Sequence, residues 1–130
     1  MKEGWYKSYY KNGEYWEAGI YKDGKKEDKW VEYYESGKVE VEENYKDGKQ
    51  EGKWVGYYKS GKMKWETNYV DGLFHGKTVR SYESGQVEQE INYKNGAYEG
   101  KWVEYDEEGN ITDEDIMKDG KCVEMCEGDE

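Results

Sequence analysis

Residues 30–49 read WVEYYESGKVEVEENYKDGK, and this stretch decides the fold. Two runs rich in β-branched and aromatic residues, 30–34 and 39–45, are each followed by a short polar segment that contains Ser-Gly or Asp-Gly. Both pairs suit tight hairpin loops, because glycine adopts the positive φ angles of such loops without a steric penalty. The stretch therefore predicts two antiparallel strands joined by one hairpin loop and followed by another.

The same pattern recurs every 24 residues. Two sets of glycines keep this spacing, one at Gly13, Gly37, Gly61, Gly85 and Gly109 and one at Gly24, Gly48, Gly72, Gly96 and Gly120. The chain thus divides into the units 4–27, 28–51, 52–75, 76–99 and 100–123, with a tail at 124–130. A unit of this length is a supersecondary element that buries its apolar face only against its neighbours. Since proline is absent and helical periodicity is weak, we expect an all-β fold, with residues 1–130 forming a single domain. Its expected architecture is an elongated single-layer antiparallel β-meander of stacked hairpins.

Loop length determines which side chains share a face. With a two-residue loop at Ser36 and Gly37, the expected pairs are Glu35 with Lys38, Tyr34 with Val39, Glu32 with Val41 and Trp30 with Glu43. A two-residue loop at Asp47 and Gly48 then brings Val41 opposite Trp54. Tyr34, Val39 and Trp30 share one face in this register, and the same positions are mostly aromatic or aliphatic in other units. We expect this stripe to be the core of the sheet.

The chain carries 31 acidic and 20 basic residues, for a net charge of −11. Nucleic acids and anionic membranes bind clustered lysine and arginine, so this charge argues against both and favours a basic protein partner. Lysines recur near the loops, whereas Glu40, Glu42 and Glu88 fall within strands. An alternative interpretation of these carboxylates is a solvated face that prevents edge-to-edge aggregation.

No run approaches the ~20 apolar residues of a membrane span, and Met1 leads into the first unit without a signal peptide. We therefore expect a cytoplasmic protein, with a secreted or surface form only if a leader has been removed. The expected oligomeric state is a monomer or an edge-to-edge dimer, since a single sheet leaves two open edges.

Catalytic residues are not expected, because no nucleophile lies near a base and the repeat spreads the carboxylates evenly. We expect a non-enzymatic protein without a cofactor or a metal. His75 occupies the position that Glu27, Glu51 and Glu99 hold in other units, where a surface role is expected. Cys122 and Cys126 have three residues between them and are expected to be free thiols, with a local disulfide as the alternative.

Positions where the repeat departs from its own pattern are candidates for partner recognition, because a repeat scaffold tolerates changes there. Trp65 and Trp16 stand where other units carry mostly polar residues, and Thr78 replaces a tryptophan. The candidate partner-binding residues are Trp16, Trp65, Phe74, His75, Arg80, Glu40, Glu42 and Glu88. The alternative is that the fourth unit lost its tryptophan and that Phe74 fills the gap.

The run YKDGKQEGKW at 45–54, echoed by YKNGAYEGKW at 93–102, resembles the MORN repeat in its spacing of tyrosine, glycine and tryptophan. The W-x-x-Y-Y-x-x-G-K form at 30–38 is similar to the bacterial variant found in the YwqK-like antitoxin family. The resemblance implies stacked hairpins in an elongated sheet with a groove. It also implies an antitoxin or immunity protein that neutralises a toxin by direct binding, and the charge of this chain indicates that the toxin is basic.

Two other functions fit the sequence. One is a structural or scaffolding repeat protein of a cellular or surface assembly. The other is carbohydrate binding on the aromatic stripe, which suits the abundance of tryptophan and tyrosine but has no defined polar cluster to support it.

Overall fold

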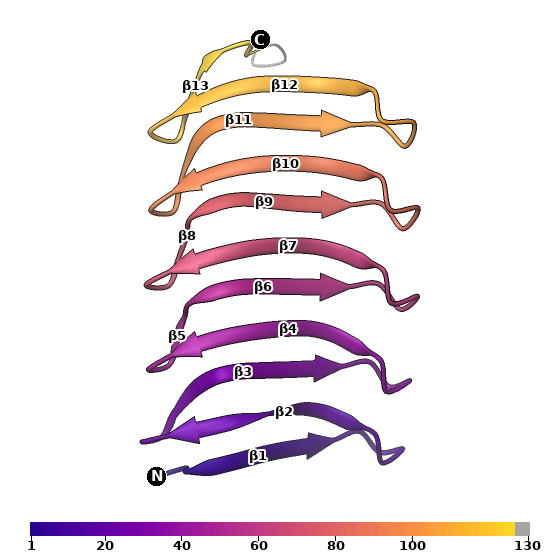
Figure 1. The fold of residues 1–130 in the computed structure, drawn as a ribbon, viewed down its shortest axis with the longest axis vertical. Helices are drawn as coiled ribbons and strands as arrows, with labels where there is room; N and C mark the ends of the chain where they lie inside the picture. Colours follow the sequence, from indigo (N-terminus) through magenta and orange to yellow (C-terminus); the bar gives the residue numbers. More distant parts are fainter. Residues whose placement is uncertain (127–130) are drawn as a thin grey trace.

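The computed structural model describes residues 1–126, which form one open antiparallel sheet of hairpins stacked in chain order (Figure 1). The strands are β1 (Gly4–Tyr9), β2 (Tyr15–Lys22), β3 (Lys25–Tyr33), β4 (Val39–Lys46), β5 (Lys49–Gln50), β6 (Gly52–Tyr57), β7 (Met63–Val70), β8 (Leu73–Phe74), β9 (Gly76–Ser81), β10 (Val87–Lys94), β11 (Ala97–Tyr105), β12 (Ile111–Lys118) and β13 (Lys121–Glu124). The predicted all-β meander is confirmed. Residues 1–126 contain no helix, and so none long and apolar enough to cross a membrane.

The two kinds of loop lie at opposite ends of the strands (Figure 1). At Asp47 and Gly48 the φ angles are 50° and 81°, and Lys46 pairs with Lys49, which makes the two-residue loop that the sequence predicted. The Ser-Gly loops are longer than predicted. The Tyr34 N–H donates to the Lys38 carbonyl at 2.8 Å, so three residues form this loop, with Gly37 at a φ of 92°.

A β-bulge next to each three-residue loop restores the predicted register. Tyr33, not Tyr34, pairs with Val39, and the register shifts by one residue before Glu32 pairs with Val41. The predicted pair of Trp30 with Glu43 is therefore confirmed, while Val39 faces the same way as Tyr33 and not as Trp30.

A second irregularity separates β5 from β6. The Glu51 N–H donates to the Asn44 carbonyl at 3.0 Å, and Gly52 has a φ of 85°. Val41 consequently pairs with Gly56 and not with Trp54. The error is two residues, and because side chains alternate with a period of two, Trp54 keeps the predicted face.

The sheet has two distinct faces, which we call the Trp face and the Val face. The Trp face carries the Trp row, defined as Trp30, Trp54, Thr78 and Trp102, and the Val face carries Val31, Val55, Val79 and Val103. Trp30 and Trp54 are 0% and 8% exposed. Their indole N–H groups donate to the carbonyls of Ile20 and Asn44, at 3.1 and 3.0 Å, so each ring lies back across the preceding strand.

Tyrosine hydroxyls tie consecutive units together at the three-residue loops. Tyr10, Tyr34, Tyr58 and Tyr82 donate to the carbonyls of Tyr33, Tyr57, Ser81 and Tyr105 at 2.5–2.7 Å. Asp106 stands at this position in the fifth unit, where its carboxylate accepts the N–H groups of Glu108 and Asn110 within its own loop. These residues are links between units as well as part of the stripe.

We expect Tyr58→Phe to lower the free energy of unfolding by about 1 kcal/mol, because the Ser81 carbonyl loses its hydroxyl donor at 2.7 Å while the ring stays. Urea denaturation followed by tryptophan fluorescence measures the change. Tyr9→Phe, at a residue that is 57% exposed, is the matched control and should change the value by less than about 0.5 kcal/mol. Equal effects of the two substitutions would contradict a linking role for the Tyr58 hydroxyl.

Candidate protein-binding groove

The Trp row is interrupted at Thr78, and a hollow of about 340 Å³ opens there on the Trp face. The hydroxyl oxygens of Thr78 and Thr67 lie 2.5 Å apart and satisfy each other at its floor. Nine residues line the hollow, which we call the Thr78 notch: Trp65, Thr67, Tyr69, Phe74, Thr78, Arg80, Gln89, Ile91 and Tyr93. Most of this lining is apolar or aromatic, as in sites that bind an apolar group.

A stack of aromatic rings forms one wall of the notch. Phe74 lies between Tyr69 and Tyr93, with ring centroids 4.7 and 4.8 Å away and interplanar angles of 25° and 28°. Phe74 pairs with Tyr69 across the two-residue loop and therefore lies at the loop end of the strands. Phe74 thus takes the position between two tyrosines that Trp54 takes between Tyr45 and Tyr69, so the alternative considered from sequence, that Phe74 fills the gap left by the missing tryptophan, is confirmed for this part of the row.

Trp65 contributes the other large aromatic side chain of the notch. It pairs with Gly56 on the neighbouring strand, and a Cβ added to Gly56 would lie 2.3 Å from the Trp65 ring. The indole therefore lies flat over a residue that has to be glycine. This contact leaves Trp65 half-buried, with part of its ring available to a partner.

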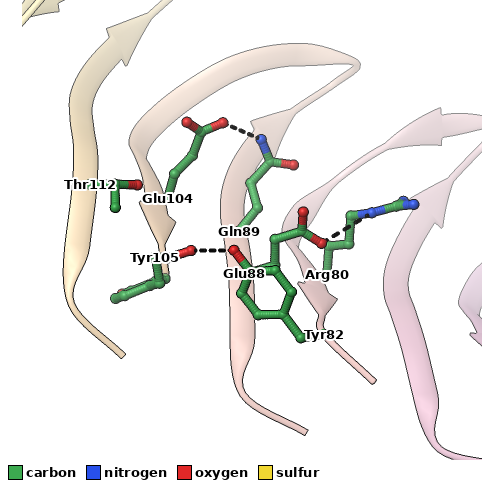
Figure 2. Close-up of a pocket in the computed structure, with 7 residues that line it drawn as sticks. All are labelled: Arg80, Tyr82, Glu88, Gln89, Glu104, Tyr105 and Thr112. Atoms are coloured by element: carbon green, nitrogen blue, oxygen red, sulfur yellow. Dashed lines mark hydrogen bonds and ion pairs between the residues drawn. The ribbon is translucent and has the colours of Figure 1, made fainter. Parts of the chain in front are cut away.

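A second hollow of about 440 Å³ continues the groove toward the three-residue loops (Figure 2). Its lining consists of Arg80, Tyr82, Glu88, Gln89, Glu104, Tyr105 and Thr112, and we call it the acidic hollow. Arg80 Nε lies 3.6 Å from Glu88 Oε1, and the Gln89 amide donates to Glu104 at 3.0 Å. Arg80 and Gln89 line both hollows, so the two form one continuous groove.

The pKa of Tyr82 reflects burial and the negative charge around the acidic hollow. Burial raises the pKa of this tyrosine, and the carboxylates of Glu88, Glu107, Asp106 and Glu104 raise it further. These four negative charges outnumber the single guanidinium of Arg80. The groove is therefore apolar at one end and negatively charged at the other.

The structure brings together four of the eight predicted binding residues. Trp65, Phe74 and Arg80 line the notch, and Glu88 lines the acidic hollow beside Arg80. The other four lie elsewhere. Trp16 is 50% exposed in the first unit, next to Tyr10 at a centroid distance of 6.4 Å.

Glu40 and Glu42 lie on β4, away from the groove. Glu40 is the extra residue in the bulge of that strand. Glu42 lies on the Val face, where its carboxylate pairs with Lys29 at 2.5 Å and accepts the Tyr57 hydroxyl. These two hydrogen bonds lower the pKa of Glu42.

His75 has a structural role that is shared with glutamates at the same position. The carboxylates of Glu27, Glu51 and Glu99 accept the first N–H of the next two-residue loop, from Asp47, Asp71 and Asp119 at 2.6–3.2 Å. His75 Nδ1 accepts the corresponding N–H of Asn95 at 3.4 Å. This contact requires an unprotonated Nδ1 and directs the imidazole to the loop, not to the groove.

A buried carboxyl on the Trp face was missed by sequence reasoning. Glu43 is 5% exposed, and burial, followed by the neighbouring Glu32, raises the pKa of Glu43 to about 8. Lys26 lies nearby and pairs with Glu17 at 3.2 Å. The predicted pairing of Glu43 with Trp30 already placed this carboxyl on the buried face, and that was the available signal.

The two cysteines are joined by a disulfide, which was the alternative to the free thiols that we expected. The Asp115 carboxylate and both sulfur atoms lie within 4.8 Å of one another. In this oxidised form the sulfurs offer no thiolate to a metal ion.

Together these features define a protein of stacked β-hairpin repeats with a groove along one face. The family model of the MORN repeat variant matches residues 29–47, 50–71, 74–95 and 98–119, more than half of the chain, and the chain belongs to this family. The first unit lies outside the matched segments but forms the same hairpin in β1 and β2. MORN repeats are in general non-enzymatic modules that bind proteins or membranes. A comparison with curated protein sequences gave no match.

We expect stability to depend on pH through Glu43. Between pH 4.5, its ordinary pKa, and about 8, the unfolded chain releases a proton that the folded chain keeps, so the free energy of unfolding falls as pH rises. Glu43→Gln should remove this contribution, which has a limit of about 1.4 kcal/mol per pH unit, and should be most stabilising above pH 8. Urea denaturation of both proteins across this range measures the difference.

Glu42→Gln is the matched control for this measurement. The pKa of Glu42 is lowered by Lys29 and Tyr57, so its contribution is present at neutral pH and is lost as pH falls through its folded pKa. The two substitutions should therefore have opposite signs at neutral pH. A destabilising Glu43→Gln at pH 9 would contradict the buried, proton-retaining carboxyl.

We also expect Thr78→Trp to raise the free energy of unfolding by about 1–2 kcal/mol, because the notch would be filled by an apolar ring. The fifth unit shows that an indole fits beside an aromatic residue at the position of Phe74, because Trp102 lies 4.9 Å from Tyr98 between ring centroids. Urea denaturation tests this, with Thr78→Ser as a control that keeps the notch open, and a less stable Thr78→Trp would show that an indole does not fit.

Proposed function

We propose that this chain is a non-enzymatic protein-binding repeat module, and most concretely an antitoxin or immunity protein that neutralises a basic toxin by direct binding in the cytoplasm. The observation that carries the proposal is the continuous groove formed by the Thr78 notch and the acidic hollow. It lies in the third to fifth units, where Trp65, Phe74, Thr78 and Arg80 depart from the repeat. Aromatic residues and arginine are the usual anchors of protein interfaces.

The negative charge of the chain and of its groove supports a basic partner. The chain has a net charge of −11, and the acidic hollow is surrounded by carboxylates that act on Tyr82. Complementary charge accelerates encounter and selects among partners, while the apolar notch supplies desolvated contact area. A toxin that acts on nucleic acid has a cationic substrate-binding face, and an acidic groove would cover such a face.

The lining of the groove suits recognition better than chemistry. Arg80 pairs with Glu88, and the Gln89 amide donates to Glu104. The residues that line the two hollows include no histidine and no cysteine. Fixed hydrogen-bonding groups next to an apolar notch are typical of a binding surface.

A scaffolding function is the second candidate, and the open sheet edge at β1 favours it. Trp5 is 74% exposed on this edge strand, at the position where other units carry Lys29, Lys53, Lys77 and Lys101. An exposed edge strand with an exposed tryptophan is suited to pairing with another strand. In this function the chain would join copies of itself or other components edge to edge.

Affinity capture from the native lysate at low and then moderate salt tests the proposal. The bait is compared with a Trp65→Ala/Phe74→Ala double variant and with Trp16→Ala, an exposed aromatic outside the groove. We expect one basic protein that is lost at moderate salt, is retained by Trp16→Ala and binds the double variant at least about 30-fold more weakly. Recovery of the chain itself, or of several components that are indifferent to the double variant, would instead support the scaffold.

A further inference from the structure

The repeat itself indicates which chemical group fits the Thr78 notch. In the second and third units the corresponding place is filled by the rings of Trp30 and Trp54, which are 0% and 8% exposed. Trp54 lies between Tyr45 and Tyr69, with ring centroids 5.2 and 5.3 Å away in edge-to-face contact. In the fourth unit Phe74 takes the place between Tyr69 and Tyr93, and Thr78 leaves a hollow of about 340 Å³ beside this stack.

The indoles of Trp30 and Trp54 each use a carbonyl acceptor on the preceding strand. The carbonyls of Ile20 and Asn44 accept the N–H groups of Trp30 and Trp54, and Asn68 holds the equivalent position in the third unit. A carbonyl has two lone pairs, and the Asn44 carbonyl already accepts two donors. Asn68 does not line the notch, whose apolar and aromatic lining makes an aromatic ring the group that it accommodates best.

The acidic hollow begins about two strand residues from the notch, since Thr78 and Arg80 are two residues apart on β9 and a strand rises ~3.3 Å per residue. Glu88 and Glu104 each make one contact there, with Arg80 and Gln89. A carboxylate has about four acceptor sites, so both retain capacity for a cationic donor. In an extended segment, residues i and i+2 point to the same side.

Resting on the proposed function, we infer that the partner inserts an extended segment with an aromatic residue and a basic residue two positions apart. The aromatic ring enters the Thr78 notch. The lysine or arginine meets Glu88 and Glu104 in the acidic hollow. The occupant is thus a protein segment with the pattern aromatic-x-basic, and the negative charge at one end of the groove sets its direction.

An NMR titration of the isotopically labelled chain with the peptide acetyl-Gly-Trp-Ser-Lys-Gly-amide tests this inference. We expect shifts of the Thr78, Gln89 and Ile91 amides with a Kd of about 1 mM or tighter. Replacing tryptophan by leucine, or lysine by glutamate, should weaken the affinity at least about tenfold. The same peptide should bind Trp16→Ala, a change at an exposed aromatic residue outside the groove, with unchanged affinity.

Thr78→Trp is the decisive variant, because it fills the notch from within the chain. It should lose peptide binding while its melting temperature stays at or above that of the unchanged protein. Glu88→Gln/Glu104→Gln should retain binding of the tryptophan peptide but no longer discriminate lysine from glutamate. Unchanged peptide binding by folded Thr78→Trp would overturn the inference, and so would the absence of shifts at 10-fold the expected Kd.

The inference and the proposed function fail in different ways. If Thr78→Trp still captures a basic protein from the lysate in a salt-sensitive manner, the antitoxin proposal stands and the notch is not where its partner binds. If a glucose or chitin oligosaccharide shifts Thr78 and Ile91 while the peptide does not, the groove binds carbohydrate and the inference is wrong.

Discussion

The contact on which this structure depends is the indole of one unit lying across the strand of the unit before it. A single-layer sheet has no second layer to cover its apolar face, so the first and second units are covered by the indoles of Trp30 and Trp54 from the units that follow them. Trp30 shows how close this contact is, because a Cβ added to Gly19 would lie 2.1 Å from its ring. The indole N–H is satisfied by a backbone carbonyl, which lets a large polar-tipped ring be fully buried. Position and orientation of the ring are therefore fixed together.

Side-chain hydrogen bonds at both ends of the strands also link each unit to the next. The tyrosine hydroxyls link the three-residue loops over 23 residues, and the glutamates link the two-residue loops over 20. Each link satisfies a backbone group that a sheet leaves unpaired at a loop. The same links hold the groove, because Tyr82 is one of the linking tyrosines and also lines the acidic hollow. A partner therefore binds a surface that folding has already ordered, so binding costs little conformational entropy there.

Much of the fold follows from the glycine spacing, and the errors have physical causes. Ser-Gly and Asp-Gly are equally compatible with tight loops, so the sequence does not reveal that Gly37 ends a three-residue loop while Gly48 ends a two-residue loop. A bulge compensates the extra loop residue, which is why Trp30 still pairs with Glu43. The site was predictable only in part. Trp65, Phe74 and Arg80 were identified as departures from the repeat, but Glu42 was assigned to the site although it neighbours Glu43 and must face the opposite way.

The notch could not be predicted from the sequence, because it depends on the orientation of the aromatic rings in and beside it. A missing tryptophan at Thr78 makes a hollow only if Trp54 leans toward the second unit and Phe74 stacks at the loop end. Both conditions are met, and the hydroxyls of Thr67 and Thr78 satisfy each other where an indole would otherwise lie. A place that breaks the local rule of a repeat is expected where binding requires it. The missing indole at Thr78 is thus the feature that gives the Trp face a specific shape.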